Sequence, residues 1–166
     1  MSDDMSMMSN RNIEIERKFL VISDLPRLTN GKRIIQSYIF ASPEKELRIR
    51  ITDNKCLLSI KINMDDFLRE EYEYKIPLEE GKRLIKIGTN FPPIEKVRYI
   101  INVDNMNWEI DLFEGENEGL VLAEIELTHP DQEFEKPSWI KEEVTSDLRF
   151  YNANLFTNPY KKWCIK

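Results

Sequence analysis

Hydrophobic and polar side chains alternate along the stretch from Ile13 to Val21. Residues 13, 15, 19 and 21 are apolar, whereas Glu14, Glu16 and Lys18 fall on the opposite face. A period of two is typical of a β-strand, because successive side chains point to opposite sides of the backbone. We therefore predict a strand with one apolar and one charged face. For this strand alone, a charged face that simply meets water is the favoured interpretation.

The same alternation recurs along most of the chain. It predicts further strands over residues 34–40, 47–52, 56–62, 69–76, 95–103, 106–113 and 120–128. A helical pattern covers Leu78–Ile87, Pro137–Ile140 indicates the start of a helix, and Tyr151–Phe156 is predicted to be a last short helix. Eight strands joined mainly by short connections predict a mainly β (α+β) fold. The expected architecture is an antiparallel barrel or a curved meander, flanked by a few short helices.

The polar faces of these strands carry charges of both signs. The basic members are Lys18, Arg48, Arg50, Lys61, Arg69, Lys75, Lys96 and Arg98. The acidic members are Glu14, Glu16, Glu71, Glu73, Glu109, Asp111, Glu124 and Glu126. Two arrangements remain open at this point. In an ordinary barrel the charges lie outside, whereas helices that cover the outer surface would leave the charges lining the lumen.

Bulk composition limits the class of protein. The 166 residues suit one domain with a real core, predicted over residues 12–166 and preceded by a disordered tail at 1–11. The net charge of −6 argues against a nucleic-acid partner, but it leaves open a local basic pocket for an anion. The sole histidine, His129, is expected in a surface loop.

The cysteines and the N-terminal sequence bear on location. Cys56 and Cys164 are too few for a disulfide framework or a zinc site, so a reduced, cytoplasmic compartment is the default prediction. The first ten residues lack the apolar segment of a signal peptide. No run of residues reaches transmembrane length, and no membrane partner is expected.

A lumen lined by these charges would point to a particular ligand chemistry. Buried charges are costly unless they are paired or bound to ions. A polyphosphate accompanied by divalent cations satisfies both signs, because Arg and Lys bind phosphate oxygens while carboxylates bind hard cations. Mg²⁺ or Mn²⁺ suits a site that offers only oxygen ligands.

An ordered set of motifs strengthens this interpretation. The set opens with Glu14-x-Glu16-x-Lys18, the E-x-E-x-K signature. The later members are Gln36-x-Tyr38, Arg48-x-Arg50, Ser59-x-Lys61, Arg69-x-Glu71-x-Glu73, Lys96-x-Arg98-Tyr99, Trp108-Glu109-Ile110-Asp111-x-Phe113, Gly119-Leu120, Ala123-Glu124-Ile125-Glu126-Leu127, Pro137-x-Trp139 and Glu143-Val144-Thr145. In these positions the chain resembles the CYTH superfamily, the triphosphate tunnel metalloenzymes. The first motif alone would be weak evidence, but the ordered set spans nearly the whole chain.

The resemblance implies an eight-stranded antiparallel barrel whose charged tunnel binds a triphosphate. It implies metal-binding carboxylates at Glu14, Glu16, Glu124 and Glu126, with Asp111 as a contributor. It implies phosphate-binding residues at Lys18, Arg48, Arg50, Lys61 and Arg98, and Arg69, Lys96 and Arg149 complete the predicted substrate-binding set. Catalysis is assigned to Glu14, Glu16, Glu126 and Lys18, while Glu71 and Glu73 match further acidic tunnel positions. Lys96 is either a phosphate ligand or the pairing partner of an acid.

Two departures from the family pattern concern residues 59 and 146–150. Ser59 stands where threonine is more usual. The segment Ser146-Asp147-Leu148-Arg149-Phe150 differs from the more common G-D-x-R-Y form and lacks its glycine. Arg149 still precedes an aromatic residue, as in bacterial members, and the resemblance implies that it reaches the tunnel mouth. All core acidic and basic positions are retained, so an active enzyme is expected.

The leading functional hypothesis is metal-dependent hydrolysis of a triphosphate, with inorganic tripolyphosphate as the first candidate substrate. A class IV-type adenylate cyclase or a thiamine triphosphatase on the same tunnel is the alternative, and cyclic AMP formed from ATP would identify the cyclase. A non-catalytic binder of polyphosphate or nucleotide is the second alternative, which metal-dependent binding without turnover would support. A nucleoside or thiamine triphosphate remains a candidate ligand, and the oligomeric state is expected to be monomer or homodimer.

Overall fold

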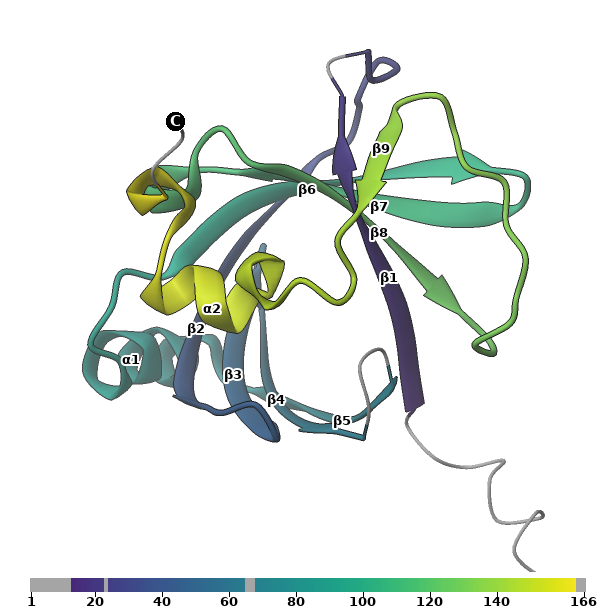
Figure 1. Cartoon of the computed structure of the whole chain (residues 1–166). Coiled ribbons are helices and arrows are strands. Elements are labelled where there is room, and N and C mark those ends of the chain that lie inside the picture. The colour runs from purple at the N-terminus through teal and green to yellow at the C-terminus, as the bar shows by residue number, and fades with distance from the viewer. Residues whose placement is uncertain (1–12, 23, 65–67, 164–166) are drawn as a thin grey trace, which may run out of the picture.

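The computed structural model describes residues 13–22, 24–64 and 68–163 (Figure 1). The predicted tail at 1–11 therefore lies outside the described residues. Strands β1 (Ile13–Val21), β2 (Lys32–Ala41), β3 (Lys45–Thr52), β4 (Lys55–Asn63) and β5 (Leu68–Ile76) come first. After helix α1 (Leu78–Gly88) follow β6 (Ile94–Val103), β7 (Met106–Phe113), β8 (Val121–Leu127) and β9 (Ile140–Glu143). The eight predicted strands are confirmed, with boundaries within a few residues of those expected.

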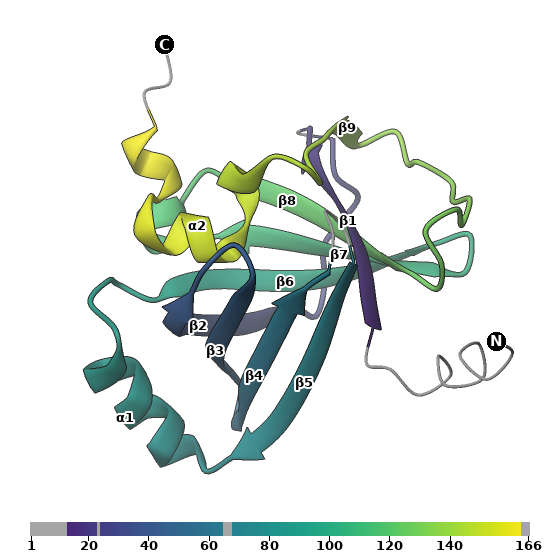
Figure 2. The ribbon, with the colours of Figure 1, turned by 60° about the horizontal axis from the view of Figure 1, so that its bottom comes forward.

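The strands form one antiparallel sheet that closes on itself. Their order is β5-β4-β3-β2-β6-β7-β8-β1-β9, and β5 also pairs with β1. That last pairing is short, because it joins Ile13–Ile15 of β1 only to Leu68–Glu70 of β5. The barrel is therefore closed by eight strands, and β9 extends the sheet beside β1 (Figure 2).

Tight hairpins explain why neighbouring strands pair in sequence. Asp53 joins β3 to β4 with a φ of 53°, and Asp104 and Asn105 join β6 to β7 with φ values of 48° and 61°. Asp and Asn tolerate this left-handed backbone better than most residues, and such turns match the twist of the strands they connect.

The open question about the charged faces is settled by what covers the outside of the barrel. Helix α1 lies on the outer face of β2, β3 and β4. Its approach requires Gly81, because a Cβ there would stand 2.1 Å from the Sγ of Cys56. The segment that follows β8 brings Phe134 and Trp139 onto an aromatic cluster around Trp108 on the outer face of β1, β7 and β8. The apolar faces thus point outward into these contacts, and the charged faces point into the lumen.

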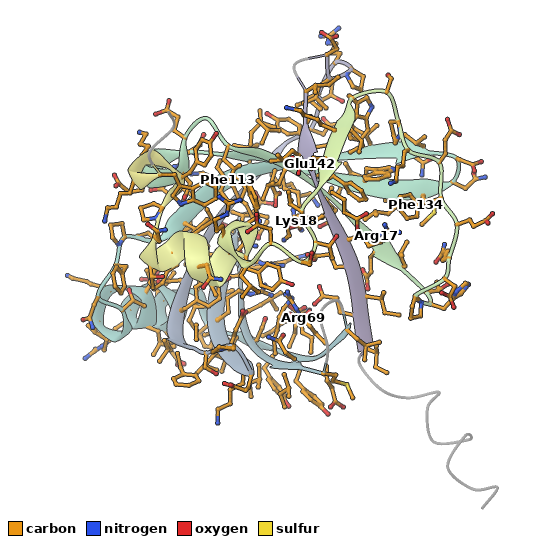
Figure 3. The ribbon with its side chains drawn as sticks, viewed as in Figure 1. Arg17, Lys18, Arg69, Phe113, Phe134 and Glu142 are labelled. Atoms are coloured by element: carbon orange, nitrogen blue, oxygen red, sulfur yellow. The ribbon has the colours of Figure 1, made fainter. Side chains whose placement is uncertain are left out.

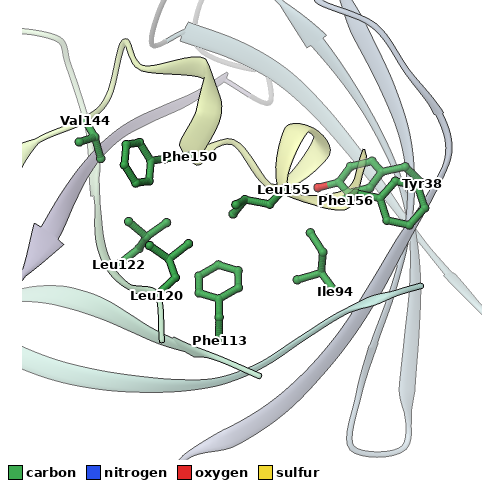
Figure 4. Packing of buried hydrophobic residues seen from close by; sticks show 9 residues of the cluster. All are labelled: Tyr38, Ile94, Phe113, Leu120, Leu122, Val144, Phe150, Leu155 and Phe156. Atoms are coloured by element: carbon green, nitrogen blue, oxygen red, sulfur yellow. The ribbon is translucent and has the colours of Figure 1, made fainter. Parts of the chain in front are cut away.

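The C-terminal segment does not lie on the outer surface of the barrel. It comprises η3 (Leu148–Phe150), α2 (Asn152–Thr157) and η4 (Tyr160–Lys162). Phe150, Leu155 and Phe156 pack against Ile94 and Leu122, which share strand faces with the tunnel residues (Figure 4). The segment therefore covers one end of the barrel interior instead of an outer face.

The predicted helix start at Pro137–Ile140 is wrong. Ile140 donates its backbone N–H to the carbonyl of Pro137 in a turn at 3.0 Å, and the chain then enters β9. Ile140 pairs with Val21 and Glu143 pairs with Phe19. The free edge of β1 beyond its short pairing with β5 supplies strand hydrogen bonds here, and this tertiary partner overrides the local helical signal.

Within the described part of the chain, none of the helices combines the length and apolar character needed to cross a membrane.

Candidate active site

The barrel encloses a charged cavity of about 610 Å³. Most of the predicted site residues line it: Glu14, Glu16, Lys18, Arg48, Arg50, Lys61, Arg69, Glu71, Glu73, Arg98, Glu124 and Glu126. They come from β1, β3, β4, β5, β6 and β8, so the site exists only when the barrel is closed. A smaller hollow adjoins it at the β1–β5 seam and is lined by Ile13, Glu14, Glu71, Glu73 and Glu126.

Strand register explains how the charges meet. Glu16 lies opposite Glu126, and Lys18 lies opposite Glu124, across the β1–β8 pairing. Side chains opposite one another on the same face of an antiparallel pair are close enough to interact directly. The E-x-E-x-K motif of β1 is thereby placed beside the two glutamates of β8, which are distant in the sequence.

Ion pairs occupy much of the lumen. The Nζ of Lys18 lies 2.5 Å from Oε1 of Glu124 and 3.1 Å from Oε1 of Glu16. Lys61 contacts Glu14 at 2.6 Å, which links β4 to β1 across the seam. Arg48 contacts Glu71 at 2.8 Å. These pairs keep charges of both signs stable inside the barrel, where an unpaired charge would be costly.

Arg98 connects two of these groups. Its guanidinium makes two hydrogen bonds of 2.6 Å to Asp111, a third of 2.7 Å to Glu124, and also pairs with Glu109. Burial by itself would lower the pKa of Arg98, but Asp111 and Glu124 raise it well above its usual value. The guanidinium is therefore a fixed positive charge in the wall.

Lys18 and Glu124 hold each other in their charged forms. Burial opposes the charge on Lys18, but Glu124 and Glu16 raise its pKa above the ordinary lysine value. Burial likewise opposes the charge on Glu124, and Lys18 and Arg98 lower its pKa well below the ordinary value. Near neutral pH this part of the lumen is consequently fully ionised.

Arg50 differs from Lys18, Arg69 and Arg98 because its surroundings lower its pKa instead of raising it. It makes no ion pair with any described residue, and its Nε is buried without a hydrogen-bond acceptor. Burial lowers its pKa, and the nearby charges of Arg48 and Arg98 lower it further. Arg50 thus faces the cavity beside two other arginines and without a carboxylate of its own, which is the electrostatic environment that an anion would relieve.

Glu126 is the acidic counterpart of Arg50. It makes no ion pair within the described chain, and its pKa is raised by burial and by the neighbouring carboxylates of Glu14, Glu16 and Glu71. Such crowded carboxylates are the ligand type that divalent cations with oxygen preference take. Among the described residues, no three potential ligands are yet gathered closely enough to enclose an ion, because Glu14 and Glu16 are drawn toward Lys61 and Lys18. The donor set therefore fits a cation, after a shift of these side chains.

Three predicted site residues lie away from the cavity wall. Lys96 and Asp111 are completely buried and pair at 2.5 Å beneath the C-terminal segment. Burial lowers the pKa of Lys96 to about 8, against the opposing influence of Asp111. Of the two roles left open for Lys96, its position favours the pairing one, and Asp111 is placed as its counter-ion.

Arg149 is also outside the cavity, contrary to the expectation that it reaches the tunnel mouth. Its side chain is 67% exposed and its Nη2 lies 2.6 Å from Asp147. Its guanidinium also lies over the rings of Phe150 and Trp163. Asp147 and these rings hold the side chain on the outer side of the C-terminal segment.

Sequence reasoning left several lining residues out of the predicted site. These are Tyr38, Glu46, Asn105, Met106, Asn107, Glu109, Leu127, Thr128, Gln132, Tyr151 and Asn152. Tyr38 and Glu109 belong to recognised motifs, and the alternation of β3 places Glu46 on the face of Arg48, so these three could have been included. Tyr151 and Asn152 follow no strand pattern, and only the docking of the C-terminal segment brings them to the lumen. Figure 3 shows this segment, in yellow, next to the labelled side chains of Lys18 and Arg69.

Fold and site together define a class of protein, a closed antiparallel barrel whose tunnel is lined by acids and bases in register. The chain belongs to the CYTH domain family, whose model matches residues 12–160. This confirms the resemblance found in the motifs.

Similar proteins include two inorganic triphosphatases. That of Acetivibrio thermocellus is 44% identical over 151 residues, which cover 90% of this chain and 97% of the relative. That of Nitrosomonas europaea is 33% identical over 146 residues, which cover 86% and 95%. The crystal structure of the inorganic triphosphatase NE1496 matches with a TM-score of 0.64 at 31% identity, over 86% of this chain and 93% of that one. A conserved hypothetical protein of Pyrococcus furiosus, with a TM-score of 0.54 and 22% identity over 71% and 80%, shares the fold.

Proposed function

We propose that this protein hydrolyses a phosphoanhydride bond of a linear triphosphate inside the barrel, with inorganic tripolyphosphate as its substrate and a divalent cation as its cofactor. The observation that carries the proposal is the largely buried Arg50 guanidinium, which has no ion pair in the described chain and faces the cavity beside Arg48 and Arg98. A phosphate chain would supply the missing negative charge. The identity of two similar proteins as inorganic triphosphatases supports the same reaction.

The positive residues around the cavity would hold the phosphates and offset charge in the transition state. Arg48, Arg50 and Arg98 lie on adjoining walls, while Lys18 and Lys61 extend from β1 and β4. In phosphoryl transfer, positioning and fixed positive charge account for most of the catalysis, because charge spreads over the oxygens of the transferred group. A triphosphate that binds Lys18 and Lys61 would also release Glu16 and Glu14 from their present ion pairs.

Those released carboxylates are the proposed ligands of the cofactor. Glu14, Glu16 and Glu126, with Glu124 nearby, would hold Mg²⁺ or Mn²⁺. The cation would offset phosphate charge and make water a better nucleophile. A carboxylate among these residues would orient the attacking water by accepting a hydrogen bond from it. Substrate and cofactor are thus expected to bind together, each taking partners from the ion pairs that exist without them.

The cavity lining favours an inorganic substrate over a nucleoside triphosphate. Only two aromatic side chains, Tyr38 and Tyr151, are among its described lining residues. The ring of Tyr151 is already covered by the guanidinium of Arg69 at 4.6 Å. A base would therefore find little ring surface on which to stack.

The cytoplasmic location of the protein and the choice between Mg²⁺ and Mn²⁺ stay predictions.

The test is release of phosphate from tripolyphosphate, ATP, GTP and thiamine triphosphate, each measured with Mg²⁺, with Mn²⁺ and with EDTA. We expect rapid release from tripolyphosphate in the presence of either metal, slower release from the other compounds, and none with EDTA. If no compound yields phosphate under any condition, the proposal is wrong. The ATP reaction should then be analysed for cyclic AMP.

A further inference from the structure

Glu46 is a carboxylate of the cavity wall that belongs to none of the ordered motifs. It lies on β3, on the lumen face that also carries Arg48 and Arg50, and it is 8% exposed. In the described part of the chain its carboxylate makes no ion pair and no hydrogen bond. A buried carboxylate that lacks a donor costs free energy, so this position calls for a ligand that donates a hydrogen bond.

Two electrostatic interactions show what lies around this carboxylate. Burial by itself would lower the pKa of Arg69, but Glu16 and Glu46 raise it above the ordinary value. Burial raises the pKa of Tyr38, and the charge of Glu46 raises it further. Arg69 also makes no ion pair with another described residue. Glu46 and Arg69 are therefore near enough for their charges to interact, yet no direct contact joins them.

These residues lie at the end of the barrel that the C-terminal segment covers. The ring of Tyr38 packs against Phe156 of α2, with the ring centroids 5.5 Å apart (Figure 4). The guanidinium of Arg69 lies over the ring of Tyr151, 4.6 Å from its centroid. The C-terminal segment thus limits how far a phosphate chain can extend past Glu46. A group that reaches Glu46 is consequently the end of a chain, a terminal phosphate.

A terminal phosphate that carries one proton satisfies both side chains at once. It offers an O–H donor to the carboxylate of Glu46, while its charged oxygens accept hydrogen bonds from the guanidinium of Arg69. A metal ion is a poor occupant of this position, because Arg69, Lys18 and Lys61 surround it with positive charge. An oxyanion without a proton is a poor occupant as well, since its oxygens would face the carboxylate with like charge and no donor.

We propose that Glu46 and Arg69 form a subsite for the protonated terminal phosphate of the substrate, in which Glu46 accepts a hydrogen bond from the P–OH group. The proposal rests on the proposed function, because it concerns the same cavity and the same substrate. Glu46 is then a specificity-determining residue that admits a protonated chain end and repels a deprotonated one.

This subsite links substrate binding to pH. A phosphate monoester loses its last proton at about pH 6. The hydrogen bond to Glu46 favours the protonated form, which raises the pKa of the bound phosphate above that of the free one. Affinity is therefore greatest below the pKa of the free phosphate and falls as the pH rises through the pKa of the bound phosphate. Binding between these two values takes up a proton from the solvent.

Other charged and titratable groups line the cavity near Glu46, and each bordering element supplies at least one. They are Glu16 and Lys18 of β1, Tyr38 of β2, Arg48 of β3, Lys61 of β4, Arg69 of β5 and Tyr151 of the C-terminal segment. Beneath that segment, burial lowers the pKa of Lys96 to about 8. All of these groups are present both in the wild type and in a variant of Glu46. The difference between the two proteins therefore isolates the contribution of the Glu46 carboxylate.

The experiment measures binding of tripolyphosphate to the full chain by isothermal titration calorimetry, without metal, from about pH 6 to about pH 9. Repeating each titration in buffers of different ionisation enthalpy gives the number of protons taken up. The wild type should lose affinity as the pH rises and should take up more protons than Glu46→Gln. Because glutamine has an N–H donor for a deprotonated phosphate, Glu46→Gln should bind about tenfold more tightly than the wild type at the upper end of this range. At the lower end the two affinities should be about equal.

Glu44→Gln is the matched control, since it removes an exposed carboxylate from the connection between β2 and β3 and should follow the wild type at every pH. Circular dichroism checks that each variant is folded. The proton uptake of the wild type needs no variant, and binding without any uptake at the upper end of the range would overturn the subsite.

An affinity ratio between the wild type and Glu46→Gln that stays constant over the whole range would also overturn the subsite, because Glu46 would then not respond to the phosphate proton. Phosphate release from tripolyphosphate with Mg²⁺, measured on the same samples, tests the proposed function separately. Release by the wild type together with a constant ratio would refute the subsite and leave the proposed function standing. Absence of release from the wild type would overturn the proposed function and the subsite with it.

Discussion

The guanidinium of Arg69 stacks on the ring of Tyr151, with its central carbon 4.6 Å from the ring centroid. The Tyr151 hydroxyl donates a hydrogen bond of 2.9 Å to the carbonyl of Thr145, whose Oγ1 accepts one of 3.0 Å from the backbone N–H of Lys18. Tyr151 thus joins β5 to β1 where their strand pairing has ended. The C-terminal segment completes the barrel wall and keeps Arg69 turned toward the lumen.

Removing the ring should release Arg69 without removing its charge. We expect Tyr151→Leu to raise the KM for tripolyphosphate by about tenfold, the effect of losing one cation–π contact and the ordering it gives. Tyr151→Phe keeps the ring and loses only the hydroxyl, so its KM should stay near that of the wild type. Steady-state kinetics at saturating metal will decide. If Tyr151→Leu has an unchanged KM and a lower melting temperature, Tyr151 supports the fold and does not position Arg69 for substrate binding.

Arg50 is expected to lower the stability of the fold while it strengthens the binding of the substrate. Replacing it with methionine removes a largely buried charge that has no counter-ion in the described chain, so the free energy of unfolding should rise by about 1–3 kcal/mol. The same change should lower kcat/KM for tripolyphosphate at least about 100-fold, because a charge-assisted contact to phosphate is lost. Chemical denaturation and phosphate release measure the two effects. Arg83→Met, on the exposed side of α1, is the control and should alter neither; a destabilised Arg50→Met would contradict the argument.

Glu126 should matter for the cofactor and little for the fold. Its carboxylate has a raised pKa and no ion-pair partner in the described chain, so Glu126→Gln relieves repulsion with Glu14 and Glu16. We expect Glu126→Gln to have unchanged or slightly higher stability and to lose metal-dependent turnover. Glu14→Gln should lose metal-dependent turnover as well. Metal titrations followed by calorimetry and phosphate release test this. Full activity in both variants would remove these residues from the proposed metal site.

Asp111, in contrast to Glu126, should matter for the stability of the fold. Asp111→Asn leaves Lys96 buried without its counter-ion and weakens the fork to Arg98, which should cost about 3–5 kcal/mol of unfolding free energy. Adding Lys96→Met should recover part of this loss, because the uncompensated charge disappears. Thermal unfolding without metal separates this structural role from ligation. Wild-type stability in Asp111→Asn would argue that the buried pair contributes nothing to the fold.

The contact between Arg17 and Glu143, which ties β9 to β1, predicts a pH dependence. The hydrogen bond from Arg17 lowers the pKa of Glu143 below its ordinary value of 4.5. A lowered carboxyl pKa stabilises the fold above the unfolded-state value, and the contribution disappears as the pH falls through the folded-state value. At pH 7 we expect Glu143→Gln to be about 1 kcal/mol less stable than the wild type. The difference should narrow as the pH falls below 4.5 and close once it has fallen through the folded-state pKa. A gap that persists in strong acid would show that the ion pair is not its cause.

The sequence predicted the strands well because alternation is local chemistry. Each of the eight predicted strands reappears, since a two-residue period fixes which side chains share a face whatever the partner strand. Glu14, Glu16, Lys18 and the later charged pairs could therefore be assigned to one charged set without knowing their contacts. The ordered motifs added the family, and with it the expectation of a tunnel.

Other features depend on contacts between distant segments, which local pattern does not encode. Helical and strand tendencies compete at Ile140, and the free edge of β1 decides for β9. Alternation places both Asp111 and Glu124 on charged faces. The packing of the C-terminal segment buries Asp111 away from the cavity, whereas Glu124 stays on the cavity wall.

By itself, then, the sequence determined the strands, the composition of the charged faces and the family. Tertiary structure alone decided which acids pair with which bases, and that Arg50 and Glu126 make no ion pair in the described chain. The physical reason is closure. Joining β1 to β5 brings together charges from opposite ends of the chain, and the balance of charge at each point of the lumen exists only after that joining.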